Sequence, residues 1–126
     1  MSLIPTPPKT GNSRLDEFLN EVYTSIRKSF FSKIYSVATD YTLLKSDYYV
    51  GVTDTTLART ITLPPLRSLE ERKVYIVKDE SGGAAANNIT IDADSAETID
   101  GGLTTVISSN YGVVRLIKNG SNWFTW

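Results

Sequence analysis

The chain has 126 residues, with 13 basic and 14 acidic side chains, and it contains neither cysteine nor histidine. These two absences exclude disulfides, thiolate nucleophiles, imidazole bases and cysteine-type zinc or iron–sulfur sites. Neither charge sign forms a block that would attract nucleic acid or an anionic membrane, so neither partner is expected. The catalytic options that remain are a carboxylate pair or a metal ion held by oxygen ligands.

Length and hydropathy predict a small soluble protein. A monomer of this size buries only about two thirds of its unfolded surface, so self-association would add stability. No apolar run approaches the roughly 20 residues that span a bilayer. The opening "MSLIPTPPKTGNS" lacks the basic region and apolar core of a signal peptide. We therefore expect a protein that is not exported by the Sec route.

Residues 1–12 are predicted to form an extended arm. "MSLIPTPPK" holds three of the five prolines. Proline fixes φ and keeps the preceding residue out of the helical region, which favours a polyproline-II-like conformation. Such an arm cannot fold alone.

An amphipathic helix is predicted from about residue 14 to residue 28, within a segment that spans 13–30. Ser13 is the expected N-cap, with Asp16 three residues later, as in a capping box. Acidic residues lie early and basic residues late, which matches the helix dipole. The apolar positions recur every three or four residues on one face: Leu15, Phe18, Leu19, Val22, Tyr23 and Ile26.

The spacing within this stripe leaves two interpretations open. The helix could cover the β-domain of its own chain, as amphipathic helices commonly do. Alternatively, a coiled-coil-like seam would join copies of the chain in a short helix bundle, most simply a trimer: Leu15, Leu19, Val22 and Ile26. Two heptads are too short to hold a bundle unaided, so another element must contribute.

The periodicity changes from helical to two-residue alternation after a linker at 31–40, and residues 41–126 are predicted to form an all-β domain. Short strand-like runs are separated by Gly, Pro, Asn, Asp or Ser. "KVYIVKD" is apolar on both faces and should be a central strand. One helical turn is expected within 64–72. The fold class is mainly β, a small sandwich or barrel, with strands at 41–44, 48–52, 59–63, 73–79, 88–92, 104–108, 113–118 and 123–126.

The final hairpin and the terminal aromatic residue carry separate predictions. Asn119-Gly120 supplies the positive φ angles of a tight turn between two strands. Trp126 ends the sequence on a large apolar side chain. Burial against a neighbouring subunit or burial in the core of its own chain would each explain it.

An acidic stretch, "NITIDADSAETIDGG", raises the question of a metal site. Counted from Asp92, an EF-hand loop matches only at Asp94, because its fifth, sixth and twelfth positions are Ala96, Glu97 and Leu103. A glycosidase pair would need a sugar-binding cleft, which this short chain does not suggest. We expect two strand connections with solvated carboxylates, and no metal or other cofactor. Whether Asp92, Asp94 and Glu97 approach their symmetry mates in an oligomer stays open.

Several motifs resemble the small β-domain of tailed-bacteriophage structural proteins, notably head fibres and short tail fibres. The resemblance spans residues 40–126, and its most specific parts are "ITLPP", "KVYIVKDESG" and "NGSNWF". The segment "IPTPPKTGNSRLDEFLNEVY" is similar to the N-termini of short fibre or adaptor-like phage proteins. Membership would imply a trimer attached to the particle through its N-terminal part, with the β-domain projecting. No catalytic residues accompany the resemblance.

The sequence thus predicts a virion structural protein, a homotrimeric short fibre or decoration protein without enzymatic activity. Its partner would be a capsid, connector or baseplate protein, bound through residues 1–30. The expected particle anchor comprises Leu3, Ile4, Pro5, Pro7 and Pro8, and the expected trimer interface comprises Leu15, Leu19, Val22, Ile26 and Trp126.

The alternative is a receptor-binding module of a tail or baseplate that recognises a host-surface glycan. Aromatic rings stack on sugar faces, and amides supply hydrogen bonds. The competing explanation is that aromatic residues in alternating strands fill the core or a subunit interface. Tyr111 lies in a turn and is the best candidate. The ligand-binding residues proposed on this basis are Tyr111, Trp123 and Asn110, with Tyr48, Tyr49, Trp126 and Asn122 as further candidates.

Overall fold

The computed structural model describes the backbone of residues 9–30 and 33–126, and the side chains of residues 9–24 and 33–126. It divides into two compact units, one ending at Ser32 and the other beginning at Lys33. The predicted anchor residues lie outside the described residues: Leu3, Ile4, Pro5, Pro7 and Pro8.

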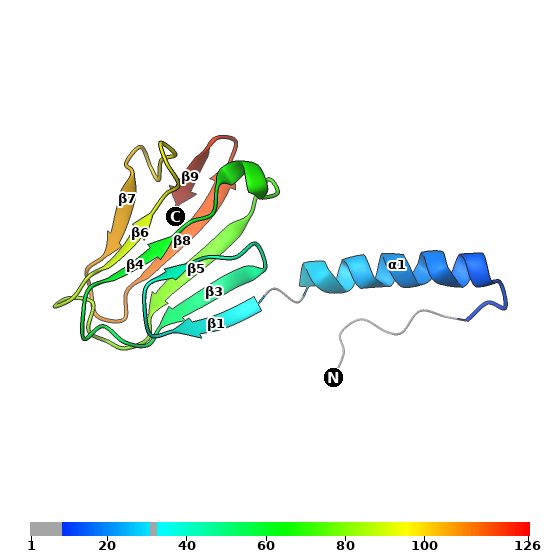
Figure 1. The fold of residues 1–126 in the computed structure, drawn as a ribbon, viewed down its shortest axis with the longest axis horizontal. Coiled ribbons are helices and arrows are strands. Elements are labelled where there is room, and N and C mark those ends of the chain that lie inside the picture. Colours follow the sequence, from blue (N-terminus) through cyan, green and yellow to red (C-terminus); the bar gives the residue numbers. More distant parts are fainter. Residues whose placement is uncertain (1–8, 31–32) are drawn as a thin grey trace. The chain divides into compact units, whose positions relative to one another are not determined.

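The first unit contains the predicted helix, α1, which runs from Ser13 to Phe30 (Figure 1). Its N-cap is Asn12 rather than Ser13, because the Asn12 side-chain oxygen accepts a hydrogen bond from the Leu15 amide at 3.0 Å. The Asp16 carboxylate reaches back to the backbone amide and the hydroxyl of Thr10, both at 2.8 Å. The first of these bonds is the main cause of the lowered pKa of Asp16. The helix start is therefore fixed one residue before the predicted cap.

The apolar stripe of α1 is exposed over the part whose side chains are described. Leu15, Phe18 and Val22 are 43%, 59% and 38% exposed. Leu19, on the same face, is half-buried. The side chain of Ile26, the fourth predicted seam residue, lies outside the described residues.

The second unit contains nine strands among the described residues, and these include all eight that the sequence predicts. The segment 64–72 holds the expected helical turn, the 3-10 helix η1 (Leu66–Ser68). The strands are β1 (Lys33–Val37), β2 (Tyr41–Thr42), β3 (Asp47–Val52), β4 (Arg59–Thr62), β5 (Val74–Asp79), β6 (Ile89–Asp92), β7 (Thr104–Ile107), β8 (Val113–Asn119) and β9 (Asn122–Thr125).

One strand corrects a sequence prediction. Residues 31–40 were expected to be a linker, but β1 occupies most of that range and belongs to the β-domain. It pairs in parallel with β3. Each residue of β1 lies opposite a residue 14 or 15 positions later in the chain, so that Tyr35 faces Val50 and Val37 faces Val52. Ile34 and Tyr35 are both exposed, which hid the alternation that marks a strand.

The strands form two mixed sheets, which confirms the mainly-β class, and no closed barrel is present in the part of the chain that the structure describes. One sheet has five strands in the order β1-β3-β5-β8-β9, and the other has four in the order β2-β4-β6-β7. Figure 1 shows the two sheets as facing layers. Consecutive strands from β1 to β6 alternate between the sheets, and each of the first four pairs in parallel with the strand two places on. The chain therefore coils around the core before antiparallel strands complete both sheets.

The core lies between the sheets and is built from the inward positions of alternating strands. Tyr75 and Trp123 are fully buried, and their ring centroids are 5.7 Å apart. Tyr75 is on β5, the middle strand of its sheet, as the two apolar faces of "KVYIVKD" predict. Full burial of an aliphatic side chain such as valine or leucine contributes roughly 1.5–3 kcal/mol. The aliphatic core residues include Leu43, Val50, Val52, Ile61, Leu63, Val77, Ile89, Ile91 and Leu116.

The last hairpin has the predicted turn. Gly120 has φ of 65°, which suits the turn between β8 and β9. Trp123 points inward, and Trp126 is 59% exposed. Burial of Trp126 in the core of its own chain is thereby excluded. Its ring instead lies beside Arg115, whose guanidinium is 5.6 Å from the ring centroid.

Candidate functional site

Four polar loops of the β-domain gather at one end, here called the loop end. Strands β1, β3 and β5 run in the same direction, so the chain leaves all three on the same side of the sandwich. The β7–β8 connection returns to that side because β7 is antiparallel to β6. The loop end therefore comprises residues 38–40, 53–58, 80–88 and 108–112.

Asp79, the last residue of β5, organises this end. Its side chain is fully buried, and its two oxygens accept five hydrogen bonds. One oxygen accepts from the amide and hydroxyl of Ser81, at 3.0 and 2.6 Å, and from the Gly82 amide at 3.0 Å. The other accepts from the amides of Ala84 and Tyr111, each at 3.0 Å. One carboxylate thus joins the 80–88 loop to the 108–112 loop.

The charge state of Asp79 is determined by these contacts. Burial alone raises its pKa, but the hydrogen bonds from Ser81, Ala84, Tyr111 and Gly82 outweigh burial and lower the pKa to about 2. Asp79 is consequently a charged anchor at neutral pH. Because its oxygens already have five donors, it is a poor candidate for a general acid or a metal ligand.

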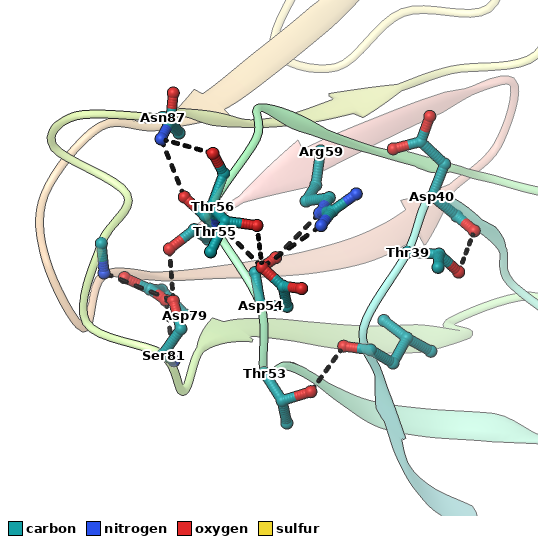
Figure 2. A network of polar contacts seen from close by, with 12 residues as sticks. Thr39, Asp40, Thr53, Asp54, Thr55, Thr56, Arg59, Asp79, Ser81 and Asn87 are labelled. Atoms are coloured by element: carbon teal, nitrogen blue, oxygen red, sulfur yellow. Dashed lines mark hydrogen bonds and ion pairs between the residues drawn. The ribbon is translucent and has the colours of Figure 1, made fainter.

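A second set of contacts ties the 53–58 loop to its neighbours (Figure 2). The hydroxyls of Thr55 and Ser81 are 2.5 Å apart, and the Asn87 amide donates to the Thr55 carbonyl at 2.9 Å. Arg59 lies 3.2 Å from the Asp54 carboxylate and also donates to the Asp54 carbonyl at 2.8 Å. The hydroxyl and amide of Thr56 are the main cause of the lowered pKa of Asp54, and Arg59 adds to it. The loops therefore form one cross-linked surface.

Tyr111 and Asn110, two of the predicted ligand-binding residues, lie on this surface. Tyr111 is 60% exposed and has φ of 58°, an uncommon conformation for a residue with a side chain. Its ring lies so close to Gly82 that a Cβ atom there would come within 2.5 Å of the ring. The side-chain oxygen of Asn110 accepts from the Ala85 amide at 2.9 Å. Tyr111 thus presents a fixed, exposed aromatic ring. The side-chain oxygen of Asn110 is already engaged by the 80–88 loop.

The other aromatic candidates lie elsewhere. Trp123 is fully buried in the core, where its ring packs on Tyr75. A surface ligand cannot reach it, so the prediction that Trp123 binds a ligand is wrong. Tyr48 is 38% exposed. Tyr49 donates its hydroxyl to Glu80 at 2.8 Å, and burial together with this bond raises its pKa to about 12. The structure does not bring Trp123 together with Tyr111 and Asn110.

The acidic stretch holds loops together at the opposite end of the sandwich. Both carboxylate oxygens of Glu97 accept from the Leu66 amide, at 3.0 and 3.2 Å, next to the start of η1. Asp100 accepts from the amide of Thr125 at 3.0 Å and from the hydroxyl of Thr125, and that hydroxyl bond is the main cause of its lowered pKa. Within the described ranges no three acidic side chains group as metal ligands would. Two of the four acids are thus committed to neighbouring loops.

Two shallow hollows lie near the β8–β9 turn. One has a volume of about 280 Å³, and the other about 450 Å³. Lys118 lies at both, but its ammonium group donates to the Leu66 and Leu69 carbonyls at 2.8 and 2.6 Å. Glu71, beside the larger hollow, accepts from the Gly120 amide at 2.7 Å. These charged groups are thus engaged in holding η1 and the turn.

A second buried carboxylate, which the sequence reasoning missed, lies at the end opposite the loop end. Asp47, the first residue of β3, is fully buried. One of its oxygens accepts from the Tyr41 hydroxyl at 2.6 Å and the Leu44 amide at 2.9 Å. The other has no hydrogen bond and lies 3.6 Å from the Lys33 ammonium. Burial and the bond to Asp47 raise the pKa of Tyr41. The Asp that precedes "YYVGV" gave no signal of this role.

Comparison of the chain with protein-family models found no match, and a search of curated proteins found no similar sequence. Within the described part of the chain, α1 is not both long and apolar enough to serve as a membrane-spanning helix.

Proposed function

We propose that this chain is a virion structural protein, a short homotrimeric fibre or decoration protein that displays its β-domain from a phage particle. The observation that carries the proposal is the division into two units: a helix with an exposed apolar stripe and a β-domain whose loops are cross-linked by their own polar groups. The first unit exposes apolar surface that association would cover, and the loop end of the second unit is held together by its own polar groups.

The apolar stripe of α1 supports an intersubunit role. Phe18 exposes 59% of its surface, and Leu15 and Val22 flank it on the same face. An isolated 18-residue helix of ordinary composition is only marginally stable in water. Packing three copies along Leu15, Leu19, Val22 and Ile26 would cover the stripe, and it leaves the Pro-rich residues 1–12 to bind the particle.

Deletion of residues 2–12 tests the anchor. We expect the truncated chain to fold and associate as the full chain does but to fail to join particles that lack it. Folding is followed by circular dichroism, association by light scattering, and incorporation by binding to undecorated particles. A matched control replaces the surface residue Val106 on the β-domain with Thr and should join normally. Normal incorporation of the truncated chain would show that the anchor lies elsewhere.

A second measurement locates the protein on the particle. The full chain is incubated separately with isolated heads and with isolated tails, and bound protein is quantified after sedimentation. Binding to heads indicates a capsid decoration role, whereas binding to tails indicates a connector or baseplate role. Binding to neither would contradict the proposal as a whole.

One observation favours the alternative, a glycan-binding module. Tyr111 presents a ring that is fixed by its own backbone and by contact with Gly82, and fixed aromatic rings are the groups that stack on sugars. A glycan array tests this with the full chain and with Tyr111→Ala, using Tyr35→Ala, at a tyrosine that is 41% exposed, as the control. Loss of a specific signal in Tyr111→Ala alone would support a receptor-binding tip. The absence of any signal from the full chain would count against it.

A further inference from the structure

The two sheets of the β-domain have outer faces of opposite character. On the four-stranded sheet, the register aligns Thr60 with Thr90, and Thr42 with Thr62. Asp92 and Thr104 extend the second of these rows. Apart from Val106, which lies opposite Thr90, this face is a set of hydroxyl and carboxylate groups suited to water.

On the five-stranded sheet, most of the corresponding outward positions are apolar or aromatic. The exceptions are Ser36, Gly51, Lys78 and Arg115, and the Glu80 carboxylate lies over Gly51. One row runs across the sheet from Ile34 through Tyr49, Ile76 and Arg115 to Trp126. Ile34 is 72% exposed and Trp126 59% exposed. We call this surface the outer apolar face, and it comprises Ile34, Tyr49, Val74, Ile76, Val113, Arg115, Ile117, Phe124 and Trp126.

The charged groups on this face are held by its own chain. The Glu80 carboxylate accepts a hydrogen bond from the Tyr49 hydroxyl at 2.8 Å. Arg115 donates to the Trp126 carbonyl oxygen through two nitrogens, at 3.1 and 2.8 Å, and its guanidinium lies against the Trp126 ring. Lys78 donates to the Tyr111 carbonyl. With these groups engaged, two copies of the face do not oppose free like charges. An Arg–Trp pair surrounded by aliphatic and aromatic residues is also the composition typical of interface centres.

We propose that the outer apolar face packs against the same face of other copies of this chain. The inference deepens the trimer of the proposed function, on which it rests, by adding a second contact surface to the helix. A five-stranded sheet about 24 Å wide and about 20 Å long offers roughly 500 Å² per chain. A stable interface needs about 800 Å² per partner, so the face alone falls short, as the two-heptad helix does.

A second copy is the occupant that covers both surfaces together. α1 ends at Phe30, and Ile34, the most exposed large apolar residue of the face, comes only four positions later. Helix association would therefore raise the local concentration of the faces, and face association would do the same for the helices. A foreign partner on one surface would leave the other exposed to water.

The test exploits a matched pair of valines. Val113 on the outer apolar face is 44% exposed, and Val106 on the outer face of the four-stranded sheet is 43% exposed. Sedimentation velocity over a dilution series of the full chain compares Val113→Glu and Phe124→Glu with Val106→Glu. We expect the first two to raise the dissociation constant by about tenfold or more, because association buries the introduced charge. Val106→Glu should associate as the unmodified chain does.

Three results would overturn the inference: a monomeric unmodified chain throughout the series, unchanged association of both Val113→Glu and Phe124→Glu, or equal weakening by Val106→Glu. Because the chain has no cysteine, Phe124→Cys and Val106→Cys give a second readout with a thiol-specific cross-linker, one that introduces no charge. Cross-linked oligomers from Phe124→Cys but not from Val106→Cys would support the outer apolar face as the contact between copies. If neither variant cross-links, or both do so equally, the inference fails.

The particle-binding assay separates this inference from the proposed function. Phe124→Glu that still joins particles while associating more weakly would support the face and the anchor independently. A chain that associates through the face but joins no particle would leave the inference standing and contradict the virion role.

Discussion

Asp47 and Asp79 are both fully buried and lie at opposite ends of the same sheet, yet their surroundings differ. Asp79 ends β5 and receives five hydrogen bonds, four of them from backbone amides or a hydroxyl of its own loop. Asp47 begins β3 and receives two, on one oxygen only. The two aspartates are thus equally buried but differ in their partners. Both oxygens of Asp79 accept hydrogen bonds, whereas one oxygen of Asp47 has only the Lys33 ammonium group nearby, at 3.6 Å.

The difference arises from the residues next to each aspartate in the chain. Beyond Asp79 and its neighbour Glu80 lies Ser-Gly-Gly, and these small residues let successive amides turn toward the carboxylate. Asp47 instead sits at the start of a strand, where its own amide donates to the Leu44 carbonyl at 3.1 Å. Hydrogen bonds to a charged acceptor are stronger than those between neutral groups, so Asp79 should contribute more to stability.

The largest effect is expected from Asp79→Asn. The amide is nearly the same size as the carboxylate, but its NH₂ group cannot accept hydrogen bonds. The two or three donors that were bonded to the replaced oxygen would lose their acceptor. We predict a loss of about 2–4 kcal/mol in the free energy of unfolding, measured by urea denaturation. Asp92→Asn, on the polar outer face, is the control and should change it by less than about 0.5 kcal/mol. A loss as small as that of the control would show that Asp79 is not the anchor of the loop end.

Acid provides the next test. The pKa of Asp79 in the folded chain is about 2, below the ordinary value of 3.8. Its stabilising contribution is therefore complete above about pH 4 and is lost as the pH falls toward 2. We predict a loss of about 1–2 kcal/mol across this window, less than the full shift implies because Asp79 in the folded chain is only about half protonated at pH 2. Denaturation curves at several pH values measure it.

Asp79→Asn supplies the control for the acid experiment. The variant should lose distinctly less stability between pH 4 and pH 2, since the group that titrates is gone. An identical pH dependence in the variant and the unmodified chain would assign the acid sensitivity to other carboxylates.

A smaller effect is expected from Asp47→Asn. The amide oxygen can keep the bonds from Tyr41 and Leu44, while the NH₂ group replaces an oxygen that accepts no hydrogen bond. The ion pair with Lys33 is lost, but that lysine side chain is 40% exposed. We predict a change of about 1 kcal/mol or less by the same urea measurement. A loss equal to that of Asp79→Asn would erase the contrast between the two aspartates.

The smallest effect is expected from Lys33→Met introduced into Asp47→Asn. With the carboxylate neutralised, the ammonium has no charge to pair with, and methionine preserves most of the apolar stem. We predict less than about 0.5 kcal/mol of further change, determined in a double-mutant cycle. A larger loss would reveal a role for Lys33 outside the pair, for instance through its contact with the Tyr35 ring at 4.3 Å.

Local features of this fold could be read from the sequence because they depend on residues close together in the chain. The helix is predicted by the three-and-four spacing of Leu15, Leu19 and Val22, and the final turn by Asn119-Gly120. Two-residue alternation located eight strands. It also predicted that β5 is central, since both of its faces are apolar.

Features that depend on distant pairing could not be read in this way. β1 was missed because Ile34, an outward residue, is as apolar as an inward one. The roles of Trp123 and Trp126 depend on register: Leu116, a core residue, lies opposite Thr125, which places Trp123 inward and Trp126 outward. Asp79 receives a bond from Tyr111, 32 residues away, and no local pattern marks that contact.

The alternation of strands between the two sheets has a consequence for how the chain folds. Ile34 pairs with Tyr49, and Ile61 pairs with Ile91, so the early strands meet only after intervening strands have crossed to the other sheet and returned. Loop closure must precede each of these pairings, which slows folding. The Tyr75–Trp123 contact lies at the centre of the core, and Trp123 belongs to β9, so the core is complete only when β9 is in place. We expect a chain that lacks β9 to remain largely unfolded by circular dichroism, whereas the full chain folds in one cooperative step.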